Sequence, residues 1–453
     1  MTTYREPARD IPVRAYDVVV AGGGTAGVMA AIAAARQGAR TALIEAKGYT
    51  GGLVTEGGTA LHSFYNLYTA FDVPQKQVVG GIPWELVSRL QAQGGATEHA
   101  AMLPGGDYDA VNTTVDVEAY KLLSLTMLRE AGVALYLNTL VVDAVREGDR
   151  VTGVICESRS GREMFAAAAV VDATGYGDVC GRAGAAYTEP NDHAVANSIG
   201  VAGVDVEQYH DFFADMGAIE QAARAPRDGA LDRWVRLQPS YAKMPQAFRE
   251  EAAAIGLSSV VTTTHDDYFM FLKLNVQCEA SPTDRDAATR AEVALRERQA
   301  RAVALLRRYV PGCARAFIAR SSPTLCIRRG RCVACDVDMT IEDIVQGRRF
   351  DDEVLLYGFH DSAPSIQIAG GGWYGLPFGA LRVRGLENLL AVGMLISSDW
   401  KAHMSTRNTV CAMAQGQAAG VAAALCAQRG EGTRALPYPV LREALLAQGV
   451  ILS

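Results

Sequence analysis

The segment from Tyr16 to Glu45 constrains this chain more than any other part of its sequence. An apolar run over residues 16–21 is typical of a buried parallel strand, and it leads into a glycine-rich turn of the form G-x-G-x-x-G at 22–27. An alanine-rich stretch then predicts a helix, and residues 41–44 predict a second strand. A strand, a glycine turn, a helix and a strand that ends on an acid together predict a dinucleotide-binding unit.

The residues of this turn have separate roles in such a unit. Gly22 permits the tight turn, Gly24 lets the backbone approach a pyrophosphate, and Gly27 lets the helix pack on the strand. Phosphates then meet free N–H groups at the helix N-terminus, and Glu45 accepts hydrogen bonds from an adenosine ribose. The other residues that we expect at this cofactor site are Thr25, Ala26 and Ala46.

The composition excludes several classes of function. The 453-residue chain is 49% hydrophobic and 21% charged, as in ordinary globular proteins. Its net charge of −7 leaves no basic stripe to neutralise phosphates, so nucleic acid is not expected as a partner. An apolar leader and a long apolar run are both missing, so we expect neither secretion nor a membrane span. We expect a small-molecule substrate, and the sequence leaves the oligomeric state open.

Nine cysteines are scattered along the chain. An odd number of cysteines without a leader fits reduced thiols in the cytoplasm, where we expect the protein. The pair Cys332 and Cys335 has the C-x-x-C spacing of a redox dithiol or of half a zinc site. Only Cys326 lies near this pair, so a structural role is favoured and no metal is expected.

The rest of the chain divides into three parts, because its length exceeds one hydrophobic core. A predicted helix over 115–130 is followed by a β-meander over 133–172, which belongs with the opening unit in a domain of residues 1–188. Residues 189–368 carry more charge and a long helical pattern at 289–309, as expected of an inserted domain. Residues 369–453 then complete the first domain with a strand ending at Gly393 and a long last helix.

These segments resemble the FAD-dependent oxidoreductase family, with a glutathione-reductase-type fold and a fumarate-reductase-like layout. The matching segments are 17–45, Thr50-Gly51-Gly52, 115–178, Arg328-Arg329-Gly330-Arg331 with 340–343, and 387–420. Residues 201–314 match nothing that we recognise. The resemblance implies FAD as the cofactor and an α/β fold: a Rossmann-like FAD-binding domain with a parallel sheet and β-meander, and an inserted α+β substrate domain.

The resemblance also implies further cofactor contacts. Gly51 and Gly52 are expected beside the flavin, and the backbone of Val142 beside the adenine. The last helix is expected to begin at Ser405, so that its positive end faces the flavin N1 and C2 carbonyl. The remaining residues that the resemblance implies at the FAD site are Gly175, Asp178, Gly393, Thr406 and Arg407. Only one dinucleotide fingerprint is present, so a separate NAD(P)H domain is not expected.

The chain also departs from the family. Similar sequences commonly have arginine where this one has Met394, and His-Glu where this one has Trp400 and Lys401. Those positions are expected toward the reacting face. The usual acid–base pattern of the family is therefore not transferred to them.

Several other side chains are candidates for catalysis at the flavin. His360, followed by Asp361, is the first candidate for a general base, and a satisfied surface histidine is the alternative. His62 and His403 are weighed in the same way, and Arg407 is a further candidate, at the flavin N1 edge or at an anionic group of the substrate. Arg329, with Arg328 and Arg331, either recognises an anion or pairs with the acidic helix start at 342–343.

We therefore expect an FAD-dependent oxidoreductase, a dehydrogenase or oxidase that transfers a hydride between a small polar substrate and flavin N5. A flavin-dependent monooxygenase or halogenase-like enzyme is the alternative among enzymes, and a non-catalytic flavin-binding module is the alternative outside them.

Overall fold

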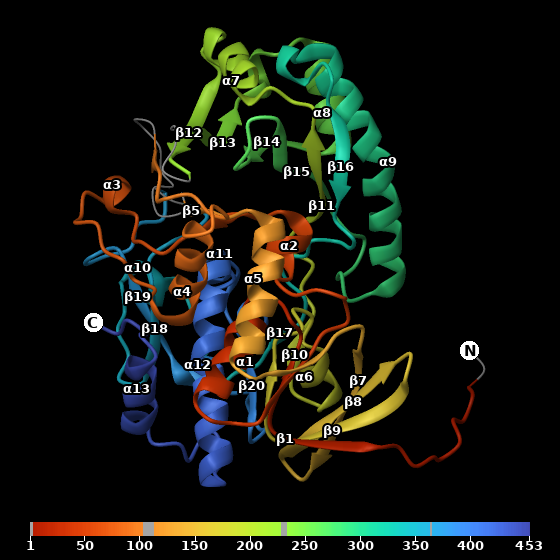
Figure 1. Cartoon of the computed structure of the whole chain (residues 1–453), viewed down its shortest axis with the longest axis vertical. Helices are drawn as coiled ribbons and strands as arrows, with labels where there is room; N and C mark the ends of the chain where they lie inside the picture. The colour runs from red at the N-terminus through yellow and green to blue at the C-terminus, as the bar shows by residue number, and fades with distance from the viewer. Residues whose placement is uncertain (1–2, 103–112, 228–232, 363–364) are drawn as a thin grey trace.

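The computed structural model of the chain describes residues 3–102, 113–227, 233–362 and 365–453. Its first sheet has seven strands in the order β6-β2-β1-β9-β8-β7, and β20 pairs with β9 (Figure 1). The strands are β1 (Val13–Ala21), β2 (Thr41–Ile44), β6 (Ala134–Tyr136), β7 (Leu140–Glu147), β8 (Arg150–Ser158), β9 (Gly161–Asp172) and β20 (Leu389–Ala391).

The pairing in this sheet is parallel on one side and antiparallel on the other. Strands β6, β2, β1, β9 and β20 are parallel, whereas β7 and β8 form an antiparallel hairpin that returns onto β9. The α/β class with a parallel sheet and a meander is thereby confirmed. One strand is placed differently, because the segment predicted at 133–137 forms β6 at the parallel edge and does not join the meander.

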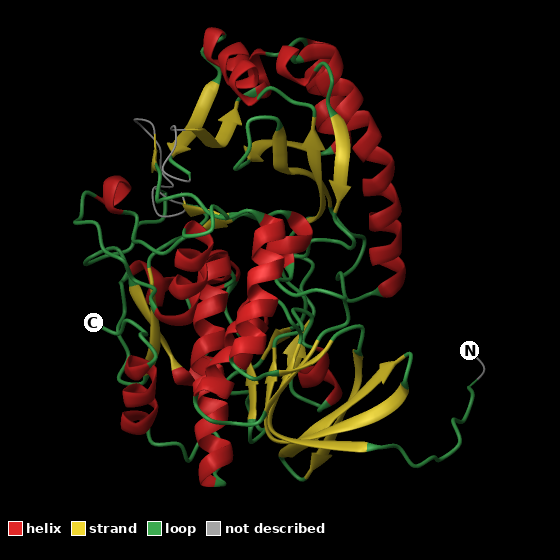
Figure 2. Cartoon of the chain, viewed as in Figure 1, coloured by secondary structure: helices red, strands yellow, loops and turns green. Residues whose placement is uncertain are grey.

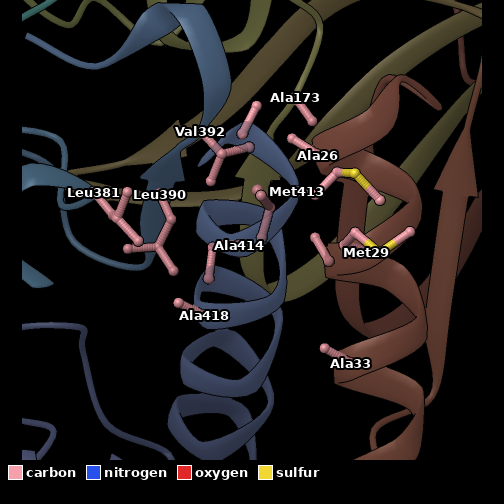
Figure 3. Close-up of a cluster of buried hydrophobic side chains, with 14 of the residues drawn as sticks. Ala26, Met29, Ala33, Ala173, Leu381, Leu390, Val392, Met413, Ala414 and Ala418 are labelled. Carbon is pink, nitrogen blue, oxygen red and sulfur yellow. The ribbon is translucent and has the colours of Figure 1, made fainter. Parts of the chain in front are cut away.

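Two helices hold the centre of this part of the fold. Helix α1 (Thr25–Arg36) follows the glycine turn, and α12 (Thr409–Arg429) lies against it (Figure 1). Figure 3 shows Ala26 and Ala33 on the side of α1 that faces α12, whereas Ala414 and Ala418 lie on the opposite face of α12, toward Leu381 and Leu390. Helix α12 is long and apolar enough to cross a membrane by composition, but 94% of its apolar window is buried inside the protein, as in a core helix.

A second sheet is antiparallel and has the order β16-β11-β15-β14-β13-β12-β4. Figure 2 shows helices on the outer side of this sheet, where they bury a core of their own. Its strands are β4 (Ala101–Met102), β11 (Val195–Ala202), β12 (Ile219–Ala225), β13 (Arg233–Pro239), β14 (Leu257–Thr262), β15 (Tyr268–Val276) and β16 (Phe317–Ser321), and its helices are α7 (Val206–Asp215), α8 (Gln246–Ile255) and α9 (Arg285–Tyr309).

The remaining elements lie outside these two sheets. They are α2 (Leu53–Gly57), β3 (Leu61–His62), α3 (Tyr68–Phe71), α4 (Gly81–Gln91), β5 (Thr113–Thr114), α5 (Val117–Glu130), α6 (Asp178–Arg182), β10 (Tyr187–Thr188), β17 (Cys332–Val333), α10 (Ile341–Val345), β18 (Glu353–Tyr357), β19 (Tyr374–Pro377), α11 (Trp400–Thr406) and α13 (Tyr438–Ala447). The segment predicted as an insert, 189–368, contains most of the second sheet. Its later part, from Val333 to Ile368, instead contributes buried side chains to the first core.

The predicted start of the last helix at Ser405 is wrong. Ser405 and Thr406 end the short helix α11, Arg407 caps it, and α12 begins at Thr409 after Asn408. Ser405 donates a hydrogen bond to the Phe359 carbonyl at 2.5 Å, which holds it in the core. The N-terminal end of α12 therefore lies four residues later than the sequence indicates.

The contact between α1 and α12 predicts that adding one methyl group at Gly420 lowers the stability of the protein. A Cβ at Gly420 would clash with the carbonyl of Ala30, and that backbone atom has no room to move. Overpacking costs about 1–3 kcal/mol and the gain in helix propensity is about 1 kcal/mol, so we expect Gly420→Ala to lower the free energy of unfolding by up to about 2 kcal/mol. Urea unfolding followed by circular dichroism measures this change.

The control is Ala427→Gly, near the partly exposed end of the same helix, which reports helix propensity alone. A Gly420→Ala protein that is more stable than the wild type would show that the two backbones are not in contact.

Candidate active site

The glycine turn at the end of β1 forms one wall of a cavity. Gly22 has φ +96°, and a Cβ there would lie 2.5 Å from the Ala173 carbonyl oxygen, so the turn requires glycine. A Cβ at Gly27 would clash with the Gly22 carbonyl, so this position serves the packing of α1. A Cβ at Gly24 would meet only the Gly52 Cα, at 3.9 Å, and would otherwise occupy the cavity. The backbone of Gly24 is therefore open to a ligand.

This first cavity has a volume of about 400 Å³ and runs from the end of β2 to the start of α12. The free N–H groups at the start of α1 lie in its wall, where an anionic group is favoured. The expected cofactor residues that line it are Gly22, Gly24, Thr25, Ala26, Glu45, Ala46, Gly52, Gly175, Asp178, Gly393 and Arg407. Eleven residues selected from separate segments of the sequence thus converge on one elongated space.

The other expected cofactor residues lie outside the lining. Gly51 donates its N–H to the Gly23 carbonyl at 2.9 Å and so ties the second glycine loop to the first. At the start of β7 the preceding residues Leu140 and Val141 line the cavity, and the contact of the Val142 backbone with adenine stays a prediction. Ser405 and Thr406 are buried in the core, and Thr409 and Ala412 of α12 line the cavity instead.

The Glu45 carboxylate is already bonded to backbone at the cavity wall. Its Oε2 accepts the Gly23 N–H at 2.7 Å, and its Oε1 accepts the Lys47 N–H at 2.8 Å. Burial raises the pKa of this carboxyl above its usual value. Glu45 therefore fixes the glycine turn, and the ribose contact stays a prediction for its remaining lone pairs.

A second cavity of about 360 Å³ adjoins the first. The two share Leu53, Ile327, Met394, Arg407 and Thr409, which mark the junction between them. The face of the second sheet that points away from its helices forms the roof of this cavity. The residues of that face in the lining are Ala196, Ser198, Arg236, Gln238, Val260, Thr262, Phe271 and Lys273.

The second cavity is rich in positive charge. Its lining includes the cations Arg236, Lys273, Arg328 and Arg407, and Asp361 is the carboxylate among the lining residues. Asp361 forms an ion pair with Arg407. Burial, together with the charges of Arg328 and Arg407, lowers the pKa of Lys273 to about 8. A cavity with this excess of cations favours an anionic ligand.

None of the three candidate histidines lines either cavity. His360 accepts the Ser362 N–H at Nδ1 (2.9 Å) and donates from Nε2 to the Lys401 carbonyl (2.8 Å), so both ring nitrogens bond to backbone. His403 bonds through Nε2 to the Arg328 carbonyl at 2.9 Å. His62 bonds to the Ala60 carbonyl, and burial lowers its pKa to about 4. These rings belong to the core.

The three arginines at 328, 329 and 331 have different roles: two form ion pairs within the protein, and one lines the second cavity. Arg329 pairs with Asp192 at 3.1 Å and bonds to the Ser398 carbonyl, while Arg331 pairs with Asp178 at 3.2 Å. Arg328 lines the second cavity and donates to the Ala194 carbonyl at 2.7 Å. The predicted pairing with the helix start at 342–343 is wrong, because Asp343 instead pairs with Arg348.

The sequence interpretation missed Lys273 and Arg236, which lie in the segment that matched nothing. Their signal is the alternation of polar and apolar residues along β13 and β15. Arg236 and Gln238 alternate with Val235 and Leu237, and Lys273 lies between the buried Leu272 and Leu274. Such alternation indicates a strand with one polar face, but only the fold shows that this face covers a cavity.

The structure also shows where the positions that depart from the family lie. Met394 lies at the junction of the two cavities. Trp400 and Lys401 begin α11 on the surface and line neither cavity, so the expectation that they face the reacting centre is wrong.

Comparisons with known proteins agree with this arrangement. The model of the family described as FAD-dependent oxidoreductase matches residues 17–445. Among solved structures, the flavin-dependent brominase Bmp2 is similar, with 13% identity and a TM-score of 0.50 over 95% of this chain and 83% of that one. At this identity the likeness concerns the fold alone.

Two further solved structures resemble the chain less. The anhydrotetracycline hydroxylase OxyS from Streptomyces rimosus has 14% identity and a TM-score of 0.48, over 96% of this chain and 66% of that one. A geranylgeranyl bacteriochlorophyll reductase-like protein from Thermoplasma acidophilum has 14% identity and a TM-score of 0.46, over 96% of this chain and 83% of that one.

The open position of Gly24 predicts how binding of the cofactor fails. Gly24→Val places a branched side chain in the cavity, and its Cβ meets the Gly52 Cα only at an ordinary contact distance of 3.9 Å, so the apoprotein should keep its fold while flavin binding is lost. Gly24→Ala should weaken binding less. The FAD released from each purified variant, measured against protein concentration, checks this order, and circular dichroism checks the fold. A Gly24→Val protein with a full complement of FAD would remove this turn from the cofactor site.

Proposed function

The chain belongs to the FAD-dependent oxidoreductase family, and on that premise we propose that it is a dehydrogenase or oxidase acting on a small polar substrate that carries an anionic group. FAD, when bound, supplies a hydride acceptor at its N5 atom. The observation that carries the proposal is the cationic second cavity, which opens onto the cofactor cavity at Met394 and Arg407.

The charges of the second cavity determine which substrate it accepts. The guanidinium of Arg328 bonds to a neutral carbonyl, and Arg236 bonds to the amide oxygens of Gln221 and Gln238 at 2.7 and 3.0 Å. The bond of Arg328 does not neutralise its charge. A carboxylate of the substrate gains a charge-assisted hydrogen bond from this guanidinium, which favours anionic substrates over neutral ones.

The pair of Arg407 and Asp361 holds the junction of the two cavities in place. Asp361 follows β18, and Arg407 lies between α11 and α12, so their ion pair links two segments that are far apart in the sequence. Phe271, Phe359 and Leu61 supply the apolar part of the second cavity, which suits the carbon skeleton of a small molecule. The anion is thus held at one part of the cavity while the carbon to be oxidised reaches the junction.

The state of the cysteines bears on the cellular compartment of the protein. All nine are free thiols, of which seven are buried, and Cys332 accepts a hydrogen bond from Arg329. We propose a reducing location such as the cytoplasm, which the absence of disulfides among them supports.

Anaerobic reduction of the flavin tests the proposed substrate class. A panel of 2-hydroxy and 2-amino carboxylic acids should include compounds that bleach the bound FAD, whereas their methyl esters, which lack the carboxylate, should not. Arg328→Gln should raise the dissociation constant of a reactive acid by about tenfold or more, because a hydrogen bond between charged groups contributes about 1.5–3 kcal/mol. Stopped-flow absorbance measures both the dissociation constant and the rate.

The matched control is Arg285→Gln, an arginine on the exposed start of α9. Equal reduction by acids and by esters would contradict the anionic substrate, and no reduction by any compound would favour a non-catalytic flavin module.

A separate prediction concerns the electron donor. The chain has one dinucleotide fingerprint, so the substrate itself should reduce the flavin. We expect NADH and NADPH to bleach the FAD far more slowly than a reactive acid does in anaerobic stopped-flow measurements. Bleaching by either nucleotide at the rate of turnover would instead support a monooxygenase or halogenase-like enzyme.

A further inference from the structure

We propose that Lys273 takes the proton from the hydroxyl or amine of the substrate while the neighbouring carbon gives up its hydride. This role rests on the proposed function and adds a named base to it. It replaces the histidines that the sequence favoured for this step, because those rings lie outside both cavities.

The position of Lys273 is set by the second sheet. On β15, Leu272 and Leu274 point into the core beneath the helices, so Lys273 points to the opposite face, into the cavity. Ser198 of β11 is its direct neighbour across the strands and lines the same cavity. In the described part of the chain, the Lys273 amine has no hydrogen bond or ion pair. A partly buried amine that faces a cavity without a partner is available to a ligand.

The charges around Lys273 disfavour its ammonium form. Arg328 and Arg407 repel a proton on Lys273, and so does Arg236 on β13. Asp361 attracts one, but its carboxylate is already paired with Arg407. Burial acts in the same direction as the three arginines, and together they bring the pKa of Lys273 to about 8. A substantial fraction of the amine is then neutral near neutral pH, as a general base requires.

The other titratable groups of this cavity do not suit the role. Asp361 is engaged by Arg407, and guanidinium groups do not release a proton at ordinary pH. Burial raises the pKa of the Cys326 thiol and outweighs the opposite effect of its hydrogen bond with the Ser322 hydroxyl, so the thiolate is disfavoured. Lys273, in contrast, lines the cavity, has a neutral amine whose lone pair can accept a proton, and lies in the same cavity as Arg328, which we propose binds the substrate anion.

The step balances without a further reactant. The O–H or N–H bond of the substrate breaks, and its proton goes to the neutral amine of Lys273. The C–H bond breaks with its electron pair, which leaves as a hydride for FAD, and a C=O or C=N bond forms. The substrate is oxidised by two electrons, and the ammonium of Lys273 returns its proton to water after the product leaves.

Direct titration of Lys273 tests this role without any substrate. The FAD-loaded protein is labelled with trace acetic anhydride between about pH 6 and about pH 10, and peptide mass spectrometry gives the labelled fraction of each lysine. Labelling of Lys273 should rise with a midpoint near pH 8, and exposed Lys401 provides the reference. A midpoint of Lys273 near the usual lysine value of about 10.4 would overturn the proposal. So would a failure to label it at any pH, because the reagent is no larger than a substrate.

The rate of flavin reduction then shows whether Lys273 acts as a base or only binds the anionic group of the substrate. In the wild type, the rate of flavin reduction by a reactive acid should rise with pH through about 8, since the amine must be neutral. Lys273→Arg keeps the positive charge but loses the base, so it should bind the acid while reduction slows by about 10²–10⁴-fold and the pH dependence disappears. Lys273→Met should show the same loss of rate, with partial rescue by added small amines.

Two outcomes would contradict the role of Lys273 in these experiments. A Lys273→Arg protein with the wild-type rate would make the lysine an anchor, and so would a wild-type profile in which pH changes only the dissociation constant. If no acid of the panel reduces the flavin, the proposed function fails, and the labelling midpoint decides separately whether the amine is neutral near pH 8.

Discussion

The close contact between helices α1 and α12 is the constraint on which the site depends. Gly416 and Gly420 of α12 lie directly against the backbone of Ala26 and Ala30, and no side chain fits between them. This contact brings the start of α12 beside the glycine turn that follows β1. The last part of the chain thereby completes a cavity that its first part begins, and Arg407 reaches the junction with the second cavity. Gln415 strengthens the link, since it bonds both to Gly393 and to the Thr406 carbonyl.

The two cavities differ in what they are built to hold. The first is lined largely by backbone and small residues, which suits a long cofactor that lies along the ends of parallel strands. The second lies under the polar face of an antiparallel sheet, and its arginines and lysine suit a small anion. In the proposed function the first cavity therefore holds the FAD common to the family, while the second cavity, lined by the second sheet together with Arg328, receives the substrate.

The sequence identified many residues that line the first cavity, because the signals for them are local. The turn at 22–27 and the acid at 45 lie within one β-α-β unit, where spacing determines geometry. The break between α11 and α12 was missed, because neither glycine nor proline marks it and Asn408 makes no side-chain cap. His360 and His403 were misjudged because burial depends on distant segments, such as the carbonyls of Lys401 and Arg328 that bind their rings. Lys273 could not be identified as a site residue from the sequence, because the sequence does not show which face of β15 lines a cavity.

A crystal structure of the protein with FAD and malonate, a simple dicarboxylate, tests the central claim most directly. The account predicts the pyrophosphate of FAD against the backbone of Gly24 and its ring at the junction formed by Met394 and Arg407. It places a malonate carboxylate within hydrogen-bond distance of Arg328. A flavin ring that points away from the junction, or malonate bound only outside the second cavity, would contradict the division of the site into a cofactor cavity and an anion-binding substrate cavity.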